Sequence, residues 1–318
     1  MTTHVIVPTL ATLHGHFSRE LPPVLRIAPG DRVRFQTLDV RWGRPDHADP
    51  FRSAPEFPGR DLVRDPGHAL CGPVWIEGAR AGMTLEVRVL SLRVGRWGWT
   101  SAGGYPSHWN VRLGLDQVPQ VRSHWALDAD AGLGRDAHGR SVALAPFLGI
   151  MGMPPDEPGR HSTTPPRASG GNIDCKELVE GSTLFLPIPV DGALFSTGDG
   201  HAVQGDGEVA GPALEAPFEL AELEFHLRPD LELVRPRART PHAWVTFGFH
   251  EDLDEATVQA LGDMLVLLDE QLGCGRTQAL ALSSLVVDLH VTQIVNGVRG
   301  VHAMISHAAL ARLMTGRD

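Results

Sequence analysis

Residues 192–208 read GALFSTGDGHAVQGDGE, an apolar run that leads into a stretch of glycines, acids and one histidine. The run of Ala193, Leu194 and Phe195 predicts a buried strand, because short apolar segments bounded by glycine are typical of sheet interiors. The glycines that follow predict a tight loop, since glycine adopts positive φ without steric cost. The sequence therefore predicts a β scaffold that presents polar side chains where a strand ends.

The polar side chains of this stretch are one imidazole and three carboxylates, separated almost entirely by small residues: Asp199, His201, Asp206 and Glu208. Imidazole and carboxylate groups bind divalent metal ions, and a spare carboxylate beside such an ion transfers protons. The stretch therefore predicts a metal-dependent active site. Glycine and aspartate are also the ordinary residues of turns, so a purely structural turn is the alternative interpretation.

The composition favours a β-rich fold and argues against a nucleic-acid partner. The 318 residues include 35 glycines and 25 prolines, which divide the chain into short segments typical of strands and turns. The hydrophobic content of 42% is too high for a disordered glycine-rich and proline-rich chain. A formal net charge of −10 opposes binding to a phosphate backbone.

Cysteine usage and hydropathy bear on the compartment. Cys71, Cys175 and Cys274 have no paired spacing, which predicts a reducing environment and no disulfide framework. No apolar run approaches the length of a membrane span, and the N-terminus lacks a basic-then-apolar signal pattern. We therefore expect a cytoplasmic protein with no membrane partner.

Early local patterns predict strands. Residues 24–27, the turn Pro29-Gly30-Asp31 and residues 33–37 predict a β-hairpin. Asp39 follows the second of these strands, and strand ends are where β scaffolds place functional groups, so Asp39 is a candidate metal ligand. An aspartate that simply begins a loop is the alternative.

The pattern changes to a helical period near residue 252. Asp252 and Glu255 form a capping box, and Gly273 is a helix stop. Between them, the apolar residues on one predicted helical face are Val258, Leu261, Leu265, Leu268 and Leu272. Residues 285–295 and 298–305 flank Asn296-Gly297 and predict a second hairpin.

We therefore expect a mainly β protein with an α+β C-terminal part. Its body is expected to be sandwich-like or barrel-like and built of short strands, followed by a subdomain of a helix and a β-hairpin. The expected division is an N-terminal β-sandwich-like domain at 1–125, a central β region with the active-site loop at 126–218, and the α+β subdomain at 219–318.

Four blocks together resemble the acetamidase/formamidase family, over nearly the full chain and most densely at residues 145–215. They read GGNIDCKELVEGSTLFLPIPVDGALFSTGDGHAVQGDGEV (170–209), APFLGIMGMPPDEPG (145–159), HALCGPVWIEGARAGMTLEVRV (68–89) and SSLVVDLHVTQIVNGVRGVHA (283–303). The resemblance implies hydrolysis of short-chain amides to a carboxylic acid and ammonia, with a divalent metal at the site. The matching positions are Asp174, Asp199, His201, Asp206 and Glu208.

From the chemistry of these residues we expect His201, Asp174 and Asp206 to bind the metal, with Asp39 and Asp199 as further candidates. Glu208 is expected to take a proton from the activated water and to pass it to the departing ammonia, with Asp199 beside it at the catalytic centre. Oxyanion or substrate contacts are expected from Gly171, Asn172 and Gly207. The metal is expected to be zinc, with calcium or manganese as alternatives, and the substrate a small amide. The chain is expected to form a homodimer or a larger homo-oligomer.

Two other functions fit the sequence. Cys175, Lys176 and Glu177 are the residue types of a thiol amidase, but neighbours on an extended chain alternate sides and do not face one carbonyl. The second is a non-catalytic β-sandwich that binds a ligand through its aromatic residues. Metal dependence and ammonia release distinguish these functions from the metal-dependent amidase.

Overall fold

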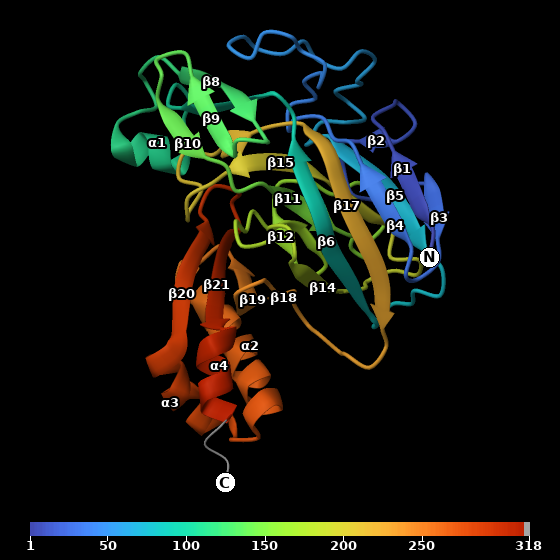
Figure 1. Ribbon diagram of the computed structural model, residues 1–318, viewed down its shortest axis with the longest axis vertical. Coiled ribbons are helices and arrows are strands. Elements are labelled where there is room, and N and C mark those ends of the chain that lie inside the picture. The colour runs from blue at the N-terminus through green and yellow to red at the C-terminus, as the bar shows by residue number, and fades with distance from the viewer. Residues whose placement is uncertain (315–318) are drawn as a thin grey trace.

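The fold, taken from a computed structural model that describes residues 1–314, is mainly β with helices concentrated near the C-terminus (Figure 1). The first sheet has nine strands, in the order β1 (Thr3–Ile6), β4 (Arg32–Phe35), β17 (Phe218–Arg228), β6 (Thr84–Val94), β14 (Thr183–Pro187), β18 (Arg237–Arg239), β19 (Ala243–His250), β21 (Arg299–Ser306) and β20 (Val287–Gln293). This architecture confirms the predicted fold class.

The second sheet has twelve strands and contains the stretch at 192–208. Its path runs through β10 (Ser141–Ala143), β9 (Leu133–Asp136), β8 (Val121–Asp128), β7 (Trp97–Ala102), β16 (Leu214–Glu215), β15 (Phe195–Val203), β11 (Phe147–Gly152), β13 (Gly170–Asn172) and β12 (Pro166–Arg167). Off this path, β5 (Leu70–Ile76) pairs with β15 and with the short strands β2 (Leu13–His14) and β3 (Leu25–Ile27).

The two sheets share one hydrophobic core. Phe195 of β15 and Phe225 of β17 meet edge to face, with ring centroids 5.1 Å apart, and both side chains are fully buried. An aromatic pair of this geometry adds specific attraction to the burial of apolar area. The core therefore holds β15, which carries part of the candidate site, against the long strands of the first sheet.

The C-terminal part has a smaller core of its own. Helix α2 (Leu253–Leu272) packs on β19 and β21, while α3 (Arg276–Val286) and α4 (His307–Met314) flank it (Figure 1). Asp252 caps α2 by accepting from two backbone N–H groups, and Gly273 ends it in the left-handed region, as predicted. Val258, however, is 64% exposed, because the buried face of α2 is centred on Ala256, Ala260 and Met264.

One predicted hairpin is wrong and the other is confirmed. β3 pairs with β5 in the second sheet, whereas β4 pairs with β1 and β17 in the first, so the turn at Gly30 connects two sheets. A turn signal specifies a reversal of the chain but not the partner of the strand that follows. β20 and β21 do form an antiparallel hairpin across Asn296-Gly297.

The predicted domain boundaries at 125/126 and 218/219 stay a prediction. Both sheets take strands from more than one of the three segments: β6 lies between β17 and β14 in the first sheet, and β7, β16 and β15 are consecutive in the second.

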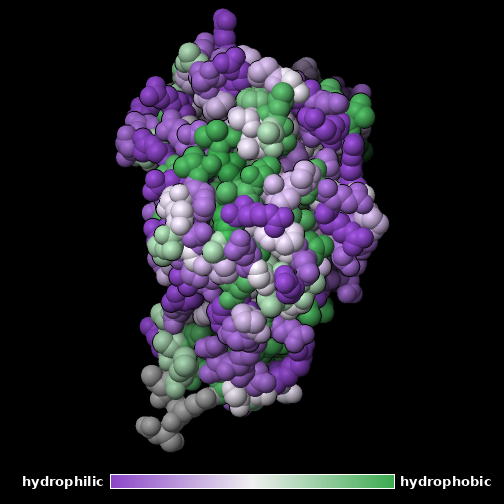
Figure 2. All heavy atoms as spheres, turned by 90° about the vertical axis from the view of Figure 1, so that its right-hand side faces the viewer, coloured by the Kyte–Doolittle hydropathy of each residue, from purple (hydrophilic) through white to green (hydrophobic). Residues whose placement is uncertain are grey.

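The face of the molecule drawn in Figure 2 is largely hydrophilic, with apolar surface densest in its upper half and smaller apolar patches below. None of the helices within residues 1–314 is long and apolar enough to cross a membrane.

Candidate metal-dependent active site

Strand β15 carries the first two site residues. Asp199 and His201 lie within β15, which pairs with β11 through Leu148–Gly200 and Ile150–Gly198. The tight loop predicted for these residues is therefore wrong. Within β15, Asp199 is the residue with a positive φ, of 56°. Residues 199 and 201 alternate with glycines, so both side chains lie on the same side of the strand.

Close packing in the sheet explains the glycines of β15. A Cβ on Gly198 would lie 2.3 Å from the carbonyl oxygen of Ala69, and one on Gly200 would lie 2.3 Å from the ring of Phe218. These glycines are therefore needed because neighbouring groups lie against the strand on the side away from Asp199 and His201. Alternating glycines are typical both of turns and of strands against which neighbouring groups pack closely, so the sequence alone favours a loop here.

Three further carboxylates converge on His201. Asp174 follows β13, Glu208 lies in the connection after β15, and Glu215 lies on β16 directly opposite His201. Ligand atoms of Asp174, His201 and Glu208 lie within 4.8 Å of one another, and so do those of Asp199, His201 and Glu215. His201 thus belongs to two overlapping groups whose side chains are all buried.

Each of these five side chains has a buried polar atom without a hydrogen-bond partner in the protein: Asp174 Oδ1, Asp199 Oδ1, His201 Nε2, Glu208 Oε2 and Glu215 Oε2. Native proteins rarely leave buried polar atoms unsatisfied, because each one costs free energy. In each of the two groups, carboxylate oxygens and one imidazole nitrogen form a typical donor set for a divalent cation. The residues therefore fit the metal that the family resemblance implies.

Gly149 makes room for this convergence. A Cβ at this position would lie 2.6 Å from Asp174 Oδ1, 2.7 Å from Asp199 Oδ2 and 3.0 Å from His201 Cε1. The three side chains thus meet over a residue of β11 that has no side chain. We take them as the part of the site that would hold the ion.

Gln204 fixes the orientation of His201. Its Nε2 donates to the carbonyl oxygen of Asp174 over 2.8 Å, so its Oε1 faces His201 Nδ1, at 2.9 Å. Because Oε1 only accepts, Nδ1 carries a proton, and Nε2 is the ring nitrogen that faces the carboxylates, 3.4 Å from Asp199 Oδ1 and 3.5 Å from Glu215 Oε1. A second hydrogen bond of this kind is usual for histidines that bind metal ions.

Asn296 brings the C-terminal hairpin to the site. Its Nδ2 donates to Asp174 Oδ2 over 2.6 Å, although the two residues are far apart in sequence. Asp174 has a positive φ of 53°, so its orientation depends on neighbours such as this amide. The predicted Asn296-Gly297 turn therefore also contributes to the site.

The pKa shifts reflect the crowding of acids. Burial, and after it the charge of Asp199, raises the pKa of Asp174 to about 7. Burial raises the pKa values of Glu208 and Glu215 well above the usual range, and neighbouring carboxylates add to the rise. For His201 burial opposes the charged form, but Glu215 and Asp199 outweigh it and raise the pKa to about 10. A positive charge is therefore favoured at this point of the protein.

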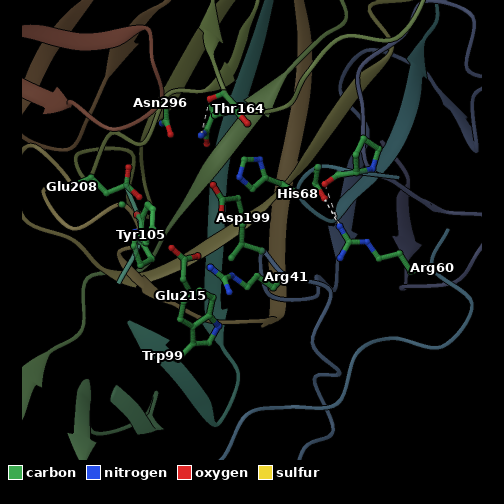
Figure 3. Close-up of a pocket in the computed structure, with 16 residues that line it drawn as sticks. Arg41, Arg60, His68, Trp99, Tyr105, Thr164, Asp199, Glu208, Glu215 and Asn296 are labelled. Atoms are coloured by element: carbon green, nitrogen blue, oxygen red, sulfur yellow. Dashed lines mark hydrogen bonds between the residues drawn. The ribbon is translucent and has the colours of Figure 1, made fainter. Parts of the chain in front are cut away.

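A cavity of ≈ 330 Å³ opens onto the cluster. Asp199, Glu208 and Glu215 line it, with His68 and Arg41 beside them (Figure 3). Asn172 also lines the cavity; its Nδ2 donates to the carbonyl oxygen of Thr164, and its Oδ1 is buried without a partner. The cavity thus presents hydrogen-bond acceptors beside the candidate metal ligands.

Two of the predicted ligands lie elsewhere. Asp39 is buried but accepts hydrogen bonds from Trp99 Nε1 and from the backbone N–H of Gly43, and these bonds satisfy both carboxylate oxygens. Asp206 lies against the C-terminal hairpin, with Oδ2 3.0 Å from His290 Nδ1 and Oδ1 3.5 Å from Lys176 Nζ. Together with His302, Asp206 and His290 form a separate group of possible ligands.

Of the three residues predicted to contact the oxyanion or the substrate, Asn172 lines the cavity, whereas Gly171 and Gly207 do not. The N–H of Gly207 donates to the carbonyl oxygen of Thr292 over 3.1 Å and is not free for a substrate. Gly171 is buried in β13, paired with Met151 and Pro166, and does not line the cavity. Asn172 does line it, with an acceptor and not a donor left unpaired.

The sequence interpretation missed four residues of the site: Glu215, Gln204, His68 and Asn296. Glu215 lies in an apolar segment, ALEAPF, where a lone acid is a signal of function because buried carboxylates need partners. No sequence pattern identifies Gln204 or His68, and Asn296 has the residue type of an ordinary hairpin turn.

Comparisons with known proteins identify the family of the chain. The sequence pattern of the Acetamidase/Formamidase family matches residues 6–159 and 159–306. The chain belongs to this family. It is 26% identical to a formamidase from Methylophilus methylotrophus and 25% identical to an acetamidase from Mycolicibacterium smegmatis, each over 62% of this chain. The matched regions span 59% and 61% of those relatives, so this chain covers about three fifths of their length.

A solved structure extends the similarity to the whole fold. The crystal structure of an acetamidase from Bacillus halodurans superposes with a TM-score of 0.83 and 27% identity, and the match covers 97% of this chain and 99% of that one. The family membership confirms the resemblance that the four sequence blocks indicate.

Proposed function

We propose that the protein hydrolyses short-chain aliphatic amides, such as formamide and acetamide, to a carboxylate and ammonia, and that it requires a divalent metal ion. The observation that carries the proposal is that four buried carboxylates form two groups of possible metal ligands around His201, in a chain of this family. Each of the five side chains has an unpartnered buried polar atom, and three of the carboxylates line the cavity. Relatives named formamidase and acetamidase support the choice of substrate class.

Amide hydrolysis is difficult because nitrogen donation stabilises the carbonyl group and amide anion is a poor leaving group. We assign His201 Nε2, Asp174 and Asp199 as the residues that hold the ion, since they meet over Gly149. When bound, a divalent ion polarises the carbonyl group and lowers the pKa of a ligated water. Zinc is our first choice because imidazole suits it, although a carboxylate-rich site also accepts manganese or calcium.

Glu208 is the proposed proton carrier. Its carboxylate lines the cavity and lies within the same group as His201 and Asp174, and its raised pKa suits a group that both accepts and returns a proton. It takes a proton from the attacking water and delivers it to the departing nitrogen. Asn172 Oδ1 is positioned at the cavity wall to accept from the substrate –NH₂ group.

The direct test is ammonia release from formamide and acetamide, measured before and after chelation, together with elemental analysis. Turnover that disappears on chelation and returns with zinc supports the proposal. Glu208→Gln is expected to lose turnover while it retains bound metal; full turnover with metal bound would show that another group carries the proton.

The thiol mechanism based on Cys175 has little support from the geometry. Its Sγ is fully buried, burial raises the pKa of the thiol, and the residue does not line the cavity. Cys175→Ala is therefore expected to retain amide hydrolysis. Inactivation by iodoacetamide but not by a chelator would favour the thiol mechanism. If the protein bound no divalent metal and released no ammonia from any simple amide, a non-catalytic binding function would replace both.

We also propose that the protein is cytoplasmic and forms a homo-oligomer. The three free cysteines suit a reducing compartment. β20 ends the first sheet with an unpaired edge, and Leu289 on it is 49% exposed, which suits contact with a second copy. Sedimentation analysis of the purified protein tests this; a monomer at all concentrations contradicts the oligomer.

A further inference from the structure

A second cavity adjoins the one that contains the candidate active site. It has a volume of ≈ 650 Å³, larger than the ≈ 330 Å³ of the first. Tyr105, Gly211 and Asn296 line both cavities. The two spaces therefore meet at these three residues, on the side of the site where the C-terminal hairpin approaches.

Tyr105 lines both cavities, and hydrogen bonds to its backbone hold it in place. Its carbonyl oxygen accepts from the N–H of Ser107 over 2.9 Å and from Asn110 Nδ2 over 3.1 Å. These bonds fasten Tyr105 to helix α1 (His108–Leu113), which Ser107 caps. The position of Tyr105 between the cavities is thus built into the local fold.

Gly211 allows the Tyr105 hydroxyl to lie close to the backbone between the two cavities. Its φ is +104°, and a Cβ there would lie 3.0 Å from the Tyr105 hydroxyl oxygen. A side chain at this position would therefore displace Tyr105, which lines both cavities.

The second cavity has an apolar wall as well as polar lining residues. The apolar wall comes from Trp109, Val209, Ile294 and Val295. Trp109 Nε1 donates to the carbonyl oxygen of Ile294 over 2.9 Å, so the polar edge of the indole is satisfied and its rings remain for apolar contact. The first cavity also has an apolar residue in Trp99, but the carboxylates of the candidate site, Asp199, Glu208 and Glu215, line it too.

We propose that the second cavity binds the acyl chain of the substrate, so that the protein prefers primary amides with an extended apolar acyl group, alkyl or arylalkyl, over acetamide. This inference rests on the proposed amide hydrolysis. The unpartnered acceptor of Asn172 and the site carboxylates suit an unsubstituted –NH₂ group in the first cavity. The acyl chain makes no hydrogen bonds, and its burial against Trp109 and Val295 removes apolar surface from water.

The test is a series of kcat/KM values for the metal-loaded protein with acetamide, butyramide, hexanamide and phenylacetamide. We expect kcat/KM to rise about fourfold for each methylene group that the cavity buries, since a buried CH₂ contributes roughly 0.8 kcal/mol. N-butylacetamide places the same carbons on nitrogen and is expected to show no such rise.

Two variants locate the effect. Val295→Trp fills the second cavity, and Trp109→Ala removes its largest apolar wall; each is expected to lower the ratio of kcat/KM for hexanamide over acetamide towards one. Val258→Trp, on the exposed face of α2 and away from both cavities, is the control and is expected to keep the wild-type ratio.

Acetamide as the best substrate, or a wild-type ratio in both cavity variants, would overturn the inference and leave the proposed function in place. An equal gain from N-butylacetamide would also overturn it, because the cavity would then accept the amine side. If metal-loaded protein released ammonia from none of these amides, the proposed function and this inference would both fall.

Discussion

Gln204 Oε1 lies 2.9 Å from His201 Nδ1, while the Nε2 of the same amide donates to the carbonyl oxygen of Asp174. The Gln204 side chain thus connects the His201 ring to the backbone of Asp174, and it sets which ring nitrogen of His201 faces the carboxylates. The consequence is an imidazole whose Nε2 is directed towards the buried carboxylates grouped around His201.

We predict that Gln204→Leu weakens metal binding. Without the acceptor at Nδ1, the His201 ring loses its preferred tautomer and orientation, and such partners of metal-binding histidines typically contribute about 10- to 100-fold in affinity. Competition with a chromophoric chelator measures the change. Gln117→Leu, at an exposed position that lines neither cavity, serves as the control, and equal affinities in the two variants would refute the role of Gln204.

Asn296→Ala is expected to lower amide turnover by about tenfold or more, because a hydrogen bond to a buried carboxylate contributes roughly 1.5–3 kcal/mol. The lost bond is the 2.6 Å contact with Asp174 Oδ2. Thermal unfolding is also expected to shift to a lower temperature, because the same hydrogen bond to a buried carboxylate contributes to stability. Steady-state kinetics of metal-loaded protein provide the measurement, and wild-type turnover would mean that the hairpin does not orient Asp174.

Gly149→Ala is expected to remove metal binding and to reduce turnover by about 100-fold or more, since a displacement of the order of 1 Å at a reactive centre has that effect. Its methyl group would meet Asp174, Asp199 and His201. Gly205→Ala is the matched control, because a Cβ there has nothing within 4 Å. Elemental analysis of both variants decides the matter: bound metal in Gly149→Ala contradicts the assigned ligand set.

The metal-free protein is expected to lose stability as the pH rises from 5 to 9. Asp174 has a folded-state pKa of about 7 against 3.8, so its contribution is complete below pH 3.8 and is lost through pH 7. The pKa of His201 is raised from 6.5 to about 10, so its contribution is complete below pH 6.5 and is lost through pH 10. For both groups, the free energy of unfolding of the metal-free protein therefore falls as the pH rises.

Urea unfolding of chelated protein at several pH values measures this trend. Zinc-saturated protein should show the opposite tendency, because the ligands bind the ion only after they lose their protons. A metal-free protein whose free energy of unfolding rises over the same interval would contradict the crowded-acid description of the site.

The extent to which sequence predicts this protein differs between its parts. The α2 helix is predictable because its cap at Asp252 and its stop at Gly273 are local signals. The ladder of β15 is not, since Gly198 and Gly200 are required by Ala69 and Phe218, which come from distant parts of the chain. A glycine in the sequence therefore does not distinguish a turn with positive φ from a position where a neighbouring group packs against the backbone.

The site shows the same division. Asp174, Asp199, His201 and Glu208 were predicted from residue type and family resemblance, and they do converge. Asp206 and Asp39 have the same residue type, but Asp206 pairs with His290 and Asp39 with Trp99. Glu215 joins the site through the register of β16 against β15, which only the fold provides.

The proposed catalysis requires a divalent ion held at His201, and reconstitution of the chelated protein with metal tests that requirement. Chelated protein is titrated with zinc while ammonia release from acetamide is recorded, in the wild type and in His201→Ala. We predict that wild-type turnover is absent without metal and returns as zinc binds, and that His201→Ala neither binds zinc nor regains turnover. Full amide hydrolysis by the chelated wild type, or by His201→Ala, would contradict the account.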